Sequence, residues 1–401
     1  MKYWDMAKAC MTSQQEIAYT INDTLAKNPE VSGQEKESSS FICNTLEKAG
    51  MPVERALAGI QYAFRAEAVK STAAGAPKLA ILCEYDALPN IGHGCGHSAS
   101  GSVSVLAALT LHELNKELLA QGQSGLPMNV DIIGTPDEEL TGGKIDLVNA
   151  GVFNDYDFAI MVHMEGVETR ANSDFLALDD YRIVFHEKPA HAAGEPWNGV
   201  NALNGMQLAL NAIDMLRQQV RPEVRIGYYV VAGGRASNII PDYAEFECCI
   251  RHTDRTYLDT VVAKVMNCVA GAALATGTTY EITQYGHKFD NMAWNETGTE
   301  LINRVLTELD FPHVTGRPTD LGSSDIGNVS KVCPAFHPNL RLKGDPKVCH
   351  TKEFAAAMLE PTIKQTITEG AQLITKTLLT LMEEPQVLAD IKAEFDRTVK
   401  H

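Results

Sequence analysis

The chain has 401 residues, more than the roughly 250–300 that a single hydrophobic core usually serves, so we expect two domains. Hydrophobic residues make up 45% and charged residues 21%, as in an ordinary globular protein. The formal net charge of −17 argues against nucleic acid or an anionic membrane surface as a partner.

The beginning of the chain predicts a cytosolic protein. Charged residues occur at Lys2, Asp5 and Lys8, and the apolar stretch of a signal peptide is missing there. The most apolar helix-like stretch, Val103–Leu111, is far shorter than the roughly 20 residues that cross a bilayer. Nine cysteines without the spacing of a small disulfide scaffold indicate mostly buried thiols.

The first 176 residues alternate strands with helices. Ser32 and Glu35 have the spacing of a capping box, which predicts a helix beginning near residue 33. Alternation of this kind favours an α/β domain with a mostly parallel central sheet. The expected elements are helices at 5–28, 33–49, 98–119 and 144–150 and strands at 79–83, 129–134 and 158–162.

Between residues 178 and 289 the pattern changes. Glu245 and Glu247 alternate with Phe246 and Cys248, which is typical of a half-buried strand. The order β-α-β-β-α-β matches the ferredoxin-like split βαβ unit. The expected elements are strands at 181–185, 225–232, 243–250 and 280–284 and helices at 200–216 and 256–275.

Longer helices return after residue 289 and end with helices near 353–382 and 386–398. The simplest organisation is one α/β domain formed by residues 1–177 and 290–401. A compact α+β domain, residues 178–289, is inserted into it.

Ligand-type residues follow the predicted strands of the first domain. Cys95 and His97 lie in a glycine-rich turn after strand 79–83, and His163 follows strand 158–162. The adjacent Glu138 and Glu139 follow strand 129–134. Because the carboxyl ends of parallel strands meet at one edge of a sheet, these side chains should converge. His350, just before a predicted helix, is a fifth candidate ligand.

Each of these signals alone has a structural explanation. A Cys-Gly-His turn is more often structural, and a pair of glutamates usually lies on the surface. Thiolate, imidazole and carboxylate together, at three strand ends, favour a metal site. Two adjacent glutamates suit hydrolysis, because one can bind metal while the other takes the proton of a water molecule.

Several sequence motifs, spread over nearly the whole chain, match those of one known protein family. The chain resembles the aminoacylase/carboxypeptidase metallopeptidase family in its amidohydrolase branch, near the p-aminobenzoyl-glutamate hydrolase-like group. The motifs that carry the resemblance are Glu84–Pro89, Gly92–His97, Gly134–Glu139, Ala190–Gly194, Gly233–Asp242 and Gly322–Ser330.

The resemblance implies a di-metal peptidase domain and an inserted lid domain that forms a homodimer. It implies two divalent metal ions, Zn²⁺ or Mn²⁺, and a small-molecule amide as substrate. Glu138 matches the general acid/base of the family. The residues that match the metal ligands are Cys95, His97, Glu139, His163 and His350.

Other site residues follow from the same resemblance. His191 matches a histidine that polarises the scissile carbonyl in the partner's site, and Asn238 matches a substrate contact in the lid. Arg235 is either a solvated loop residue or the group that binds a substrate carboxylate. Asp86 is expected to orient the ligands rather than bind metal. Related peptidases have a metal-binding histidine where this chain has Glu84.

The predicted function is a metal-dependent amidohydrolase that cleaves N-acyl, N-aroyl or aminoacyl amino acids. Glu138 would activate the attacking water, and hinges near 176–180 and 287–292 would allow the lid to close. Two alternatives stay open: a dipeptidase acting on β-alanyl or ordinary dipeptides, and a binding protein that has lost catalysis.

Overall fold

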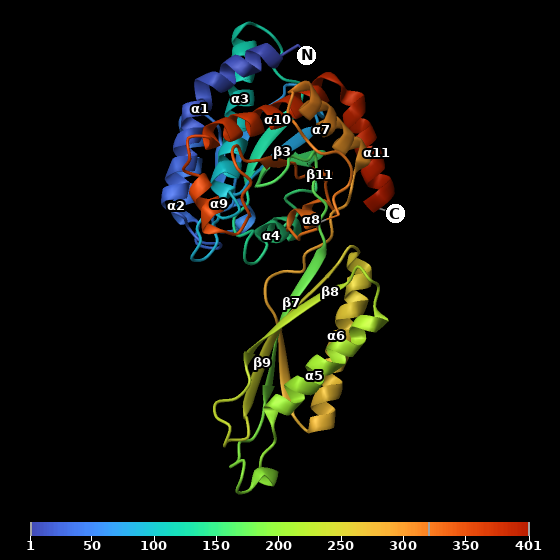
Figure 1. Cartoon of the computed structure of the whole chain (residues 1–401). Coiled ribbons are helices and arrows are strands. Elements are labelled where there is room, and N and C mark those ends of the chain that lie inside the picture. The colour runs from blue at the N-terminus through green and yellow to red at the C-terminus, as the bar shows by residue number, and fades with distance from the viewer. Residues whose placement is uncertain (1, 320, 400–401) are drawn as a thin grey trace. The chain divides into compact units, whose positions relative to one another are not determined.

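The computed structural model describes residues 2–319 and 321–399. The chain forms two compact units, which are drawn in Figure 1. Unit 2 comprises Phe175–Asn291 and the short segment Leu321–Gly327, and unit 1 comprises the rest of the described chain.

Unit 1 is built on a six-stranded sheet with the strand order β1-β2-β4-β3-β5-β11. Strands β4, β3, β5 and β11 run parallel, whereas β2 pairs antiparallel with β4 and β1 antiparallel with β2. The mostly parallel central sheet is therefore confirmed, with an antiparallel edge. The strand bounds are Val53–Arg55 (β1), Phe64–Val69 (β2), Lys78–Cys83 (β3), Asn129–Gly134 (β4), Phe158–Ile160 (β5) and Ala335–Phe336 (β11).

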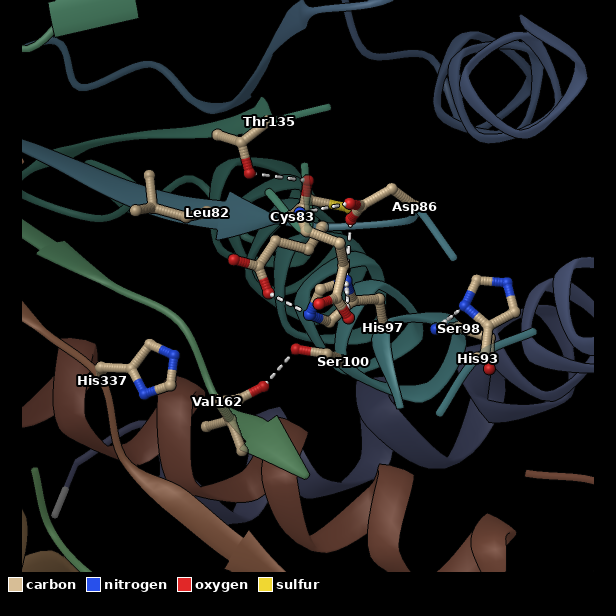
Figure 2. Close-up of polar contacts among 12 residues, drawn as sticks. Leu82, Cys83, Asp86, His93, His97, Ser98, Ser100, Thr135, Val162 and His337 are labelled. Carbon is tan, nitrogen blue, oxygen red and sulfur yellow. Dashed lines mark hydrogen bonds and ion pairs between the residues drawn. The ribbon is translucent and has the colours of Figure 1, made fainter. Parts of the chain in front are cut away.

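Helix α3, His97–Ala120, packs directly on the ends of these strands. A Cβ atom added at Gly101 would lie 2.4 Å from the carbonyl oxygen of Glu84, so the helix can approach the strand end only because this residue is glycine. Ser104 donates a hydrogen bond of 2.6 Å to the carbonyl of Leu82. Figure 2 shows a second such bond, from the hydroxyl of Ser100 to the carbonyl of Val162. These contacts fix the first two turns of α3 against the sheet edge.

The other helices of the chain are mostly those expected from the sequence. The predicted helix at 353–382 is wrong as one element, because it divides into two helices on either side of Pro361, which cannot continue a helix. The bounds are Trp4–Lys27 (α1), Lys36–Lys48 (α2), Gly143–Asn149 (α4), Glu296–Glu308 (α7), Ile326–Val329 (α8), Lys352–Ala357 (α9), Ile363–Glu383 (α10) and Pro385–Val399 (α11).

The capping box predicted at Ser32 and Glu35 is wrong. Glu35 itself precedes α2, and its side chain does not cap the helix. The carboxylate of Glu30 instead accepts hydrogen bonds from the first-turn amides of Glu37 and Ser38 at 3.0 and 2.7 Å. Ser32 instead donates a 2.7 Å hydrogen bond to the carboxylate of Asp86. Glu35 accepts hydrogen bonds from the backbone nitrogens of Gly33 and Asp137. Ser32 and Glu35 therefore bond to Asp86, Gly33 and Asp137 and not to the first amides of α2.

A small parallel pair of strands lies beside this sheet. Strand β6, His163–Glu165, pairs with β12, Asn339–Arg341, so that His163 lies opposite Asn339. The predicted strand 158–162 ends at Ile160, and His163 begins the next strand.

Unit 2 is a four-stranded antiparallel sheet with the order β10-β7-β9-β8. Helices α5 and α6 lie on one face of it (Figure 1), and the ferredoxin-like order predicted from the sequence is confirmed. The bounds are Ala177–His186 (β7), Ala202–Leu216 (α5), Arg225–Ala232 (β8), Tyr243–His252 (β9), Arg255–Thr276 (α6) and Thr279–Gln284 (β10).

Helix α6 is, among residues 2–319 and 321–399, the one helix long and apolar enough to cross a membrane by length and composition. Its residues Leu258, Val261, Val265 and Val269 are buried in the apolar cluster of unit 2. A core helix passes the same test, so this is weak evidence for a membrane span.

Candidate metal centre

Two triads of ligand-type side chains meet at the carboxyl edge of the sheet in unit 1. One triad is Cys95, His97 and His163, and the other is Cys95, Glu139 and His350. Within each triad the candidate ligand atoms lie within 4.8 Å of one another. The structure thus brings together all five predicted ligands, with Cys95 belonging to both triads.

Glu138 lies beside the same cluster. With His97 and Glu139 it forms a third group whose ligand atoms lie within 4.8 Å of one another. The predicted base is therefore next to predicted ligands, as its role requires.

The turn that carries Cys95 and His97 depends on the glycine between them. Gly96 has a φ of 81°, and a Cβ atom there would lie 2.7 Å from the Cβ of Met164, the residue after His163. Glycine adopts this left-handed conformation without steric cost. The turn therefore brings Cys95 and His97 against the strand that begins with His163.

A second tight turn follows β4 and carries Glu138 and Glu139. Asp137 has a φ of 60°, and its carbonyl accepts hydrogen bonds from Gly142 and Gly143 at 2.9 and 2.8 Å. A Cβ atom at Gly143 would lie 2.0 Å from the carbonyl oxygen of Pro136, so the loop can close only on glycine.

The backbone of His350 is also held in an unusual conformation. Its φ is 65°, which is uncommon for a residue with a side chain. Its amide donates a 2.9 Å hydrogen bond to the carbonyl of Gly94, directly before Cys95. Local strain of this kind often accompanies a functional residue.

Asp86 links several parts of the cluster and is fully buried. One oxygen lies 2.7 Å from Nδ1 of His97 (Figure 2). The other accepts hydrogen bonds from Ser32 Oγ at 2.7 Å and from the amide of Glu139 at 2.9 Å. Burial disfavours the charged form, but His97 and these donors hold the pKa of Asp86 well below its usual value. Asp86 thus has the geometry of an orienting group, which leaves Nε2 of His97 for a ligand.

The pKa shifts of His163, His97 and Cys95 are compatible with metal binding at this cluster. Burial and the nearby His337 and His97 lower the pKa of His163 well below its usual value, so His163 is neutral and able to bind metal. Burial opposes a charge on His97, but Glu84 and Asp86 raise its pKa well above the usual value. Burial and the nearby Glu139 and Glu138 raise the pKa of the Cys95 thiol well above its ordinary value. A bound cation would replace these protons, because metal binding and deprotonation are coupled.

Unpartnered polar atoms give a further test of the fit. Among the residues that the structure describes, Nε2 of His97 and Oε1 of Glu139 are buried and lack a hydrogen-bond partner. Buried polar atoms are usually satisfied, so atoms left over at one place indicate a missing ligand. The donor set, of thiol, imidazole and carboxylate, fits divalent metal ions.

Sequence reasoning missed two buried residues at this edge. His337 directly follows β11, and its ring stacks on that of His163 with 5.2 Å between centroids. Lys144, in the first turn of α4, is fully buried and lies 2.5 Å from Oε1 of Glu84. The strand-end rule would have identified His337, but its strand has only two residues.

The residue after the Cys-Gly-His turn, Ser98, packs into the protein interior. Its hydroxyl donates a 3.0 Å hydrogen bond to Oδ1 of Asn22, and its amide donates to Nδ1 of His93 at 3.2 Å (Figure 2). His93 is buried, and burial with the nearby His97 lowers its pKa to about 4. Both residues thus have structural contacts.

The predicted lid residues His191, Asn238 and Arg235 all lie in unit 2 and are exposed. Nδ1 of His191 accepts hydrogen bonds from the amides of Ala193 and Gly194 at 3.2 and 3.0 Å. The amide of Ala192 donates to the carbonyl of Asn238 at 3.0 Å. The roles of His191, Asn238 and Arg235 in the reaction stay predictions.

Comparison with known proteins identifies the family. Residues 178–276 match the family described as peptidase dimerisation domain. An Xaa-Arg dipeptidase from Mus musculus is 35% identical over 348 residues, which cover 84% of this chain and 78% of that protein. A p-aminobenzoyl-glutamate hydrolase chain from Escherichia coli (strain K12) is 32% identical over 279 residues, 65% of this chain and 56% of that protein.

A solved structure shares the fold. A Bacillus subtilis protein described as a dinuclear metal binding peptidase from the M20 family aligns with a TM-score of 0.70 at 19% identity. The alignment covers 93% of this chain and 99% of that one. Its fold agrees with a catalytic unit and an inserted lid. The chain therefore belongs to the M20 peptidase family and is a hydrolase that acts on amide bonds with divalent metal ions.

Proposed function

We propose that this hydrolase cleaves a small amide whose leaving group is a free amino acid, with a dipeptide ending in arginine as its principal substrate class. The observation that carries the hydrolytic mechanism is the pair of triads sharing Cys95, with Glu138 beside them. The substrate class is supported by the 35% identity to an Xaa-Arg dipeptidase over most of both chains.

In this proposal, Cys95, His97 and His163 would hold one divalent cation, and Cys95, Glu139 and His350 would hold another. Bound cations supply Lewis acidity, which makes a water molecule acidic enough to lose its proton near neutral pH. Glu138 accepts that proton at its carboxylate and returns it to the nitrogen of the leaving amino acid. Asp86 keeps Nδ1 of His97 occupied, so that only Nε2 is available for binding.

His191 suits the role of a hydrogen-bond donor to the scissile carbonyl. Because its Nδ1 accepts from two backbone amides, the proton of the neutral ring is on Nε2. We propose that the His191 of a second copy supplies this donor and so helps to stabilise the developing oxyanion.

A homodimer is supported by the match of unit 2 to a peptidase dimerisation domain. Strand β8 is at the edge of the sheet, and its Tyr229, Val230 and Val231 are 58%, 48% and 41% exposed. An exposed apolar edge strand is suited to pairing with the same strand of another copy. Light scattering on the purified chain should give the mass of a dimer.

Zinc is the proposed metal. Thiolate and imidazole ligands favour Zn²⁺ over Mn²⁺, which prefers oxygen ligands. Elemental analysis of the purified protein distinguishes the two. We also propose a cytosolic location, supported by nine cysteines that form no disulfide in the described part of the chain.

A substrate panel tests the proposed function. The purified enzyme is assayed with Xaa-Arg dipeptides, neutral dipeptides, p-aminobenzoyl-glutamate and N-acyl amino acids, before and after removal of metal by a chelator. We expect the largest kcat/KM with a dipeptide ending in arginine, loss of activity with the chelator and recovery with Zn²⁺. Preference for p-aminobenzoyl-glutamate would instead support the function of the E. coli relative. Hydrolysis that persists without metal would contradict the mechanism.

A further inference from the structure

Glu84 is a buried carboxylate at the end of β3, between a lysine and a predicted metal ligand. Its side chain is 1% exposed. Oε1 lies 2.5 Å from Nζ of Lys144, and Oε2 lies 3.3 Å from Nε2 of His97. Glu84 therefore contacts the one ring nitrogen of His97 that Asp86 leaves available.

The two facing atoms, Oε2 of Glu84 and Nε2 of His97, are close but do not form a hydrogen bond. Both lack a hydrogen-bond partner among residues 2–319 and 321–399, although both are buried. The two atoms are 3.3 Å apart, as in an ion pair, but no hydrogen bond joins them.

The distance between these atoms fits two ligands of the same ion. Zinc binds nitrogen and oxygen at about 2.0–2.1 Å in a tetrahedron, which places neighbouring ligand atoms about 3.4 Å apart. The observed distance of 3.3 Å between Oε2 and Nε2 is close to this value. A carboxylate oxygen of Glu84 also lies within 4.8 Å of one of Glu138, the proposed base.

We propose that Glu84 binds metal through Oε2 and is the fourth protein ligand of the ion held by Cys95, His97 and His163. This inference rests on the metal centre proposed above and adds a ligand to it. Lys144 fixes the carboxylate through Oε1 and compensates part of the negative charge that Glu84 and Cys95 bring to the buried site.

The consequence is that the two ions are bound unequally. The ion at Cys95, His97, His163 and Glu84 has four protein ligands, which is typical of a closed site. The ion at Cys95, Glu139 and His350 has three and keeps a position open, as catalytic zinc sites do. The first ion is the tightly bound one, and the second is the ion that exchanges.

Metal titration of the full-length chain tests this proposal. The metal-free protein is titrated with Zn²⁺ against a chromogenic chelator, and bound metal is counted by elemental analysis. The same samples are loaded with Co²⁺, whose visible absorption is stronger in four-coordinate than in six-coordinate sites. The variants are Glu84→Gln, Glu139→Gln and the double variant Glu84→Gln with Lys144→Met. The double variant removes both partners of a buried pair, which costs less stability than removing one.

A matched control is Asp179→Asn, which breaks another buried ion pair in unit 2. We expect two affinities in the wild type and in this control. Glu84→Gln and the double variant should weaken the tight site by about 100-fold or more and reduce the intensity of its Co²⁺ spectrum. Glu139→Gln should weaken the other site and leave the tight one.

Two tight ions with an unchanged Co²⁺ spectrum in both Glu84 variants would overturn the proposal and leave the hydrolase function intact. If Glu84→Gln does not fold, the double variant decides between the two results. A wild-type chain that binds no divalent metal would overturn both this proposal and the proposed function.

Discussion

Asp179 of unit 2 and three glutamates of unit 1 differ in how their carboxylate oxygens are satisfied. In unit 2, Asp179 is fully buried, and Arg255 contacts its two oxygens at 2.5 and 3.1 Å. In unit 1, one buried oxygen each of Glu35, Glu84 and Glu139 has no hydrogen-bond partner within the described residues.

This difference separates a structural carboxylate from one arranged to bind something. A buried carboxylate paired with a fixed guanidinium holds elements of the fold together, and its removal leaves an uncompensated charge. An unpartnered buried oxygen costs free energy unless a proton or a cation takes the position. Changes in unit 1 should therefore affect chemistry and metal, whereas changes at Asp179 should affect stability alone.

The largest effect is expected from Glu138→Gln, which keeps the shape of the side chain and removes the proton acceptor. Turnover should fall by about 10²–10⁴-fold, the usual contribution of a general base. Metal content should stay at the wild-type level, because Glu138 is not among the proposed ligands. Steady-state kinetics and elemental analysis measure the two quantities. Glu37→Gln, a surface control with a side chain 78% exposed, should behave as wild type. Normal turnover in the Glu138 variant would show that Glu138 is not the general base.

Asp179→Asn tests the other side of the comparison. Breaking the pair with Arg255 should lower the free energy of unfolding by about 1.5–3 kcal/mol, because charge-assisted hydrogen bonds are lost while Arg255 keeps its ion pair with Asp259. Urea unfolding followed by circular dichroism measures this loss, and metal content should not change. Loss of metal in this variant would mean that the two kinds of buried carboxylate are not distinct.

At Glu35 we expect a proton, rather than a cation, to occupy the carboxylate oxygen that lacks a hydrogen-bond partner. Burial and the neighbouring Asp86 raise the pKa of Glu35 from 4.5 to about 7. The folded state then holds more protons than the unfolded state between these values, so stability should fall as pH rises from 4.5 through 7. Relative to wild type, Glu35→Gln should gain stability between pH 5 and pH 8, by about 3 kcal/mol at most. Urea unfolding at the two pH values measures the gain. Equal pH dependence of both proteins would show that Glu35 is not protonated in the fold.

Ser32→Ala should give the smallest effect. It removes one of the two hydrogen bonds to Oδ2 of Asp86, so metal affinity should fall by about tenfold, as for other groups that orient ligands. Ser39→Ala is the matched control, since Ser39 donates a similar bond of 2.6 Å to the carbonyl of Tyr62. Both variants should lose about 1 kcal/mol of stability, and only Ser32→Ala should alter a chelator competition assay. Equal metal affinity in the two variants would show that the hydrogen bond from Ser32 to Asp86 does not influence metal binding.

Much of the fold follows from local pattern. Strands β3 and β4 and the six elements of unit 2 are predictable because their apolar periodicity is strong and turn residues bound them. Strands β1 and β11 escape prediction because they have only three and two residues. Strand β2 is missed although Phe64–Ala68 alternates apolar and charged residues, the pattern of a half-buried strand. The division between α9 and α10 at Pro361 is absent from the predicted elements, although proline is a direct signal for it.

The candidate site is predictable where several ligand types share one strand end. The convergence of Cys95, His97 and Glu139 follows from parallel strands alone. The capping-box pattern misassigns Ser32, because its partner Asp86 is 54 residues away and no local pattern reveals a contact of that range. The burial of Lys144 is equally hidden in the sequence, because it depends on the carboxylate of Glu84, 60 residues away.

The sharing of Cys95 between both triads has a consequence for the chemical vulnerability of the enzyme. Both triads include the one sulfur atom of Cys95, so a reagent that alkylates or oxidises it would remove a ligand from both metal sites at once rather than from one of them. Inactivation by thiol reagents should therefore be all-or-none for each copy of the chain, and bound metal should protect against it.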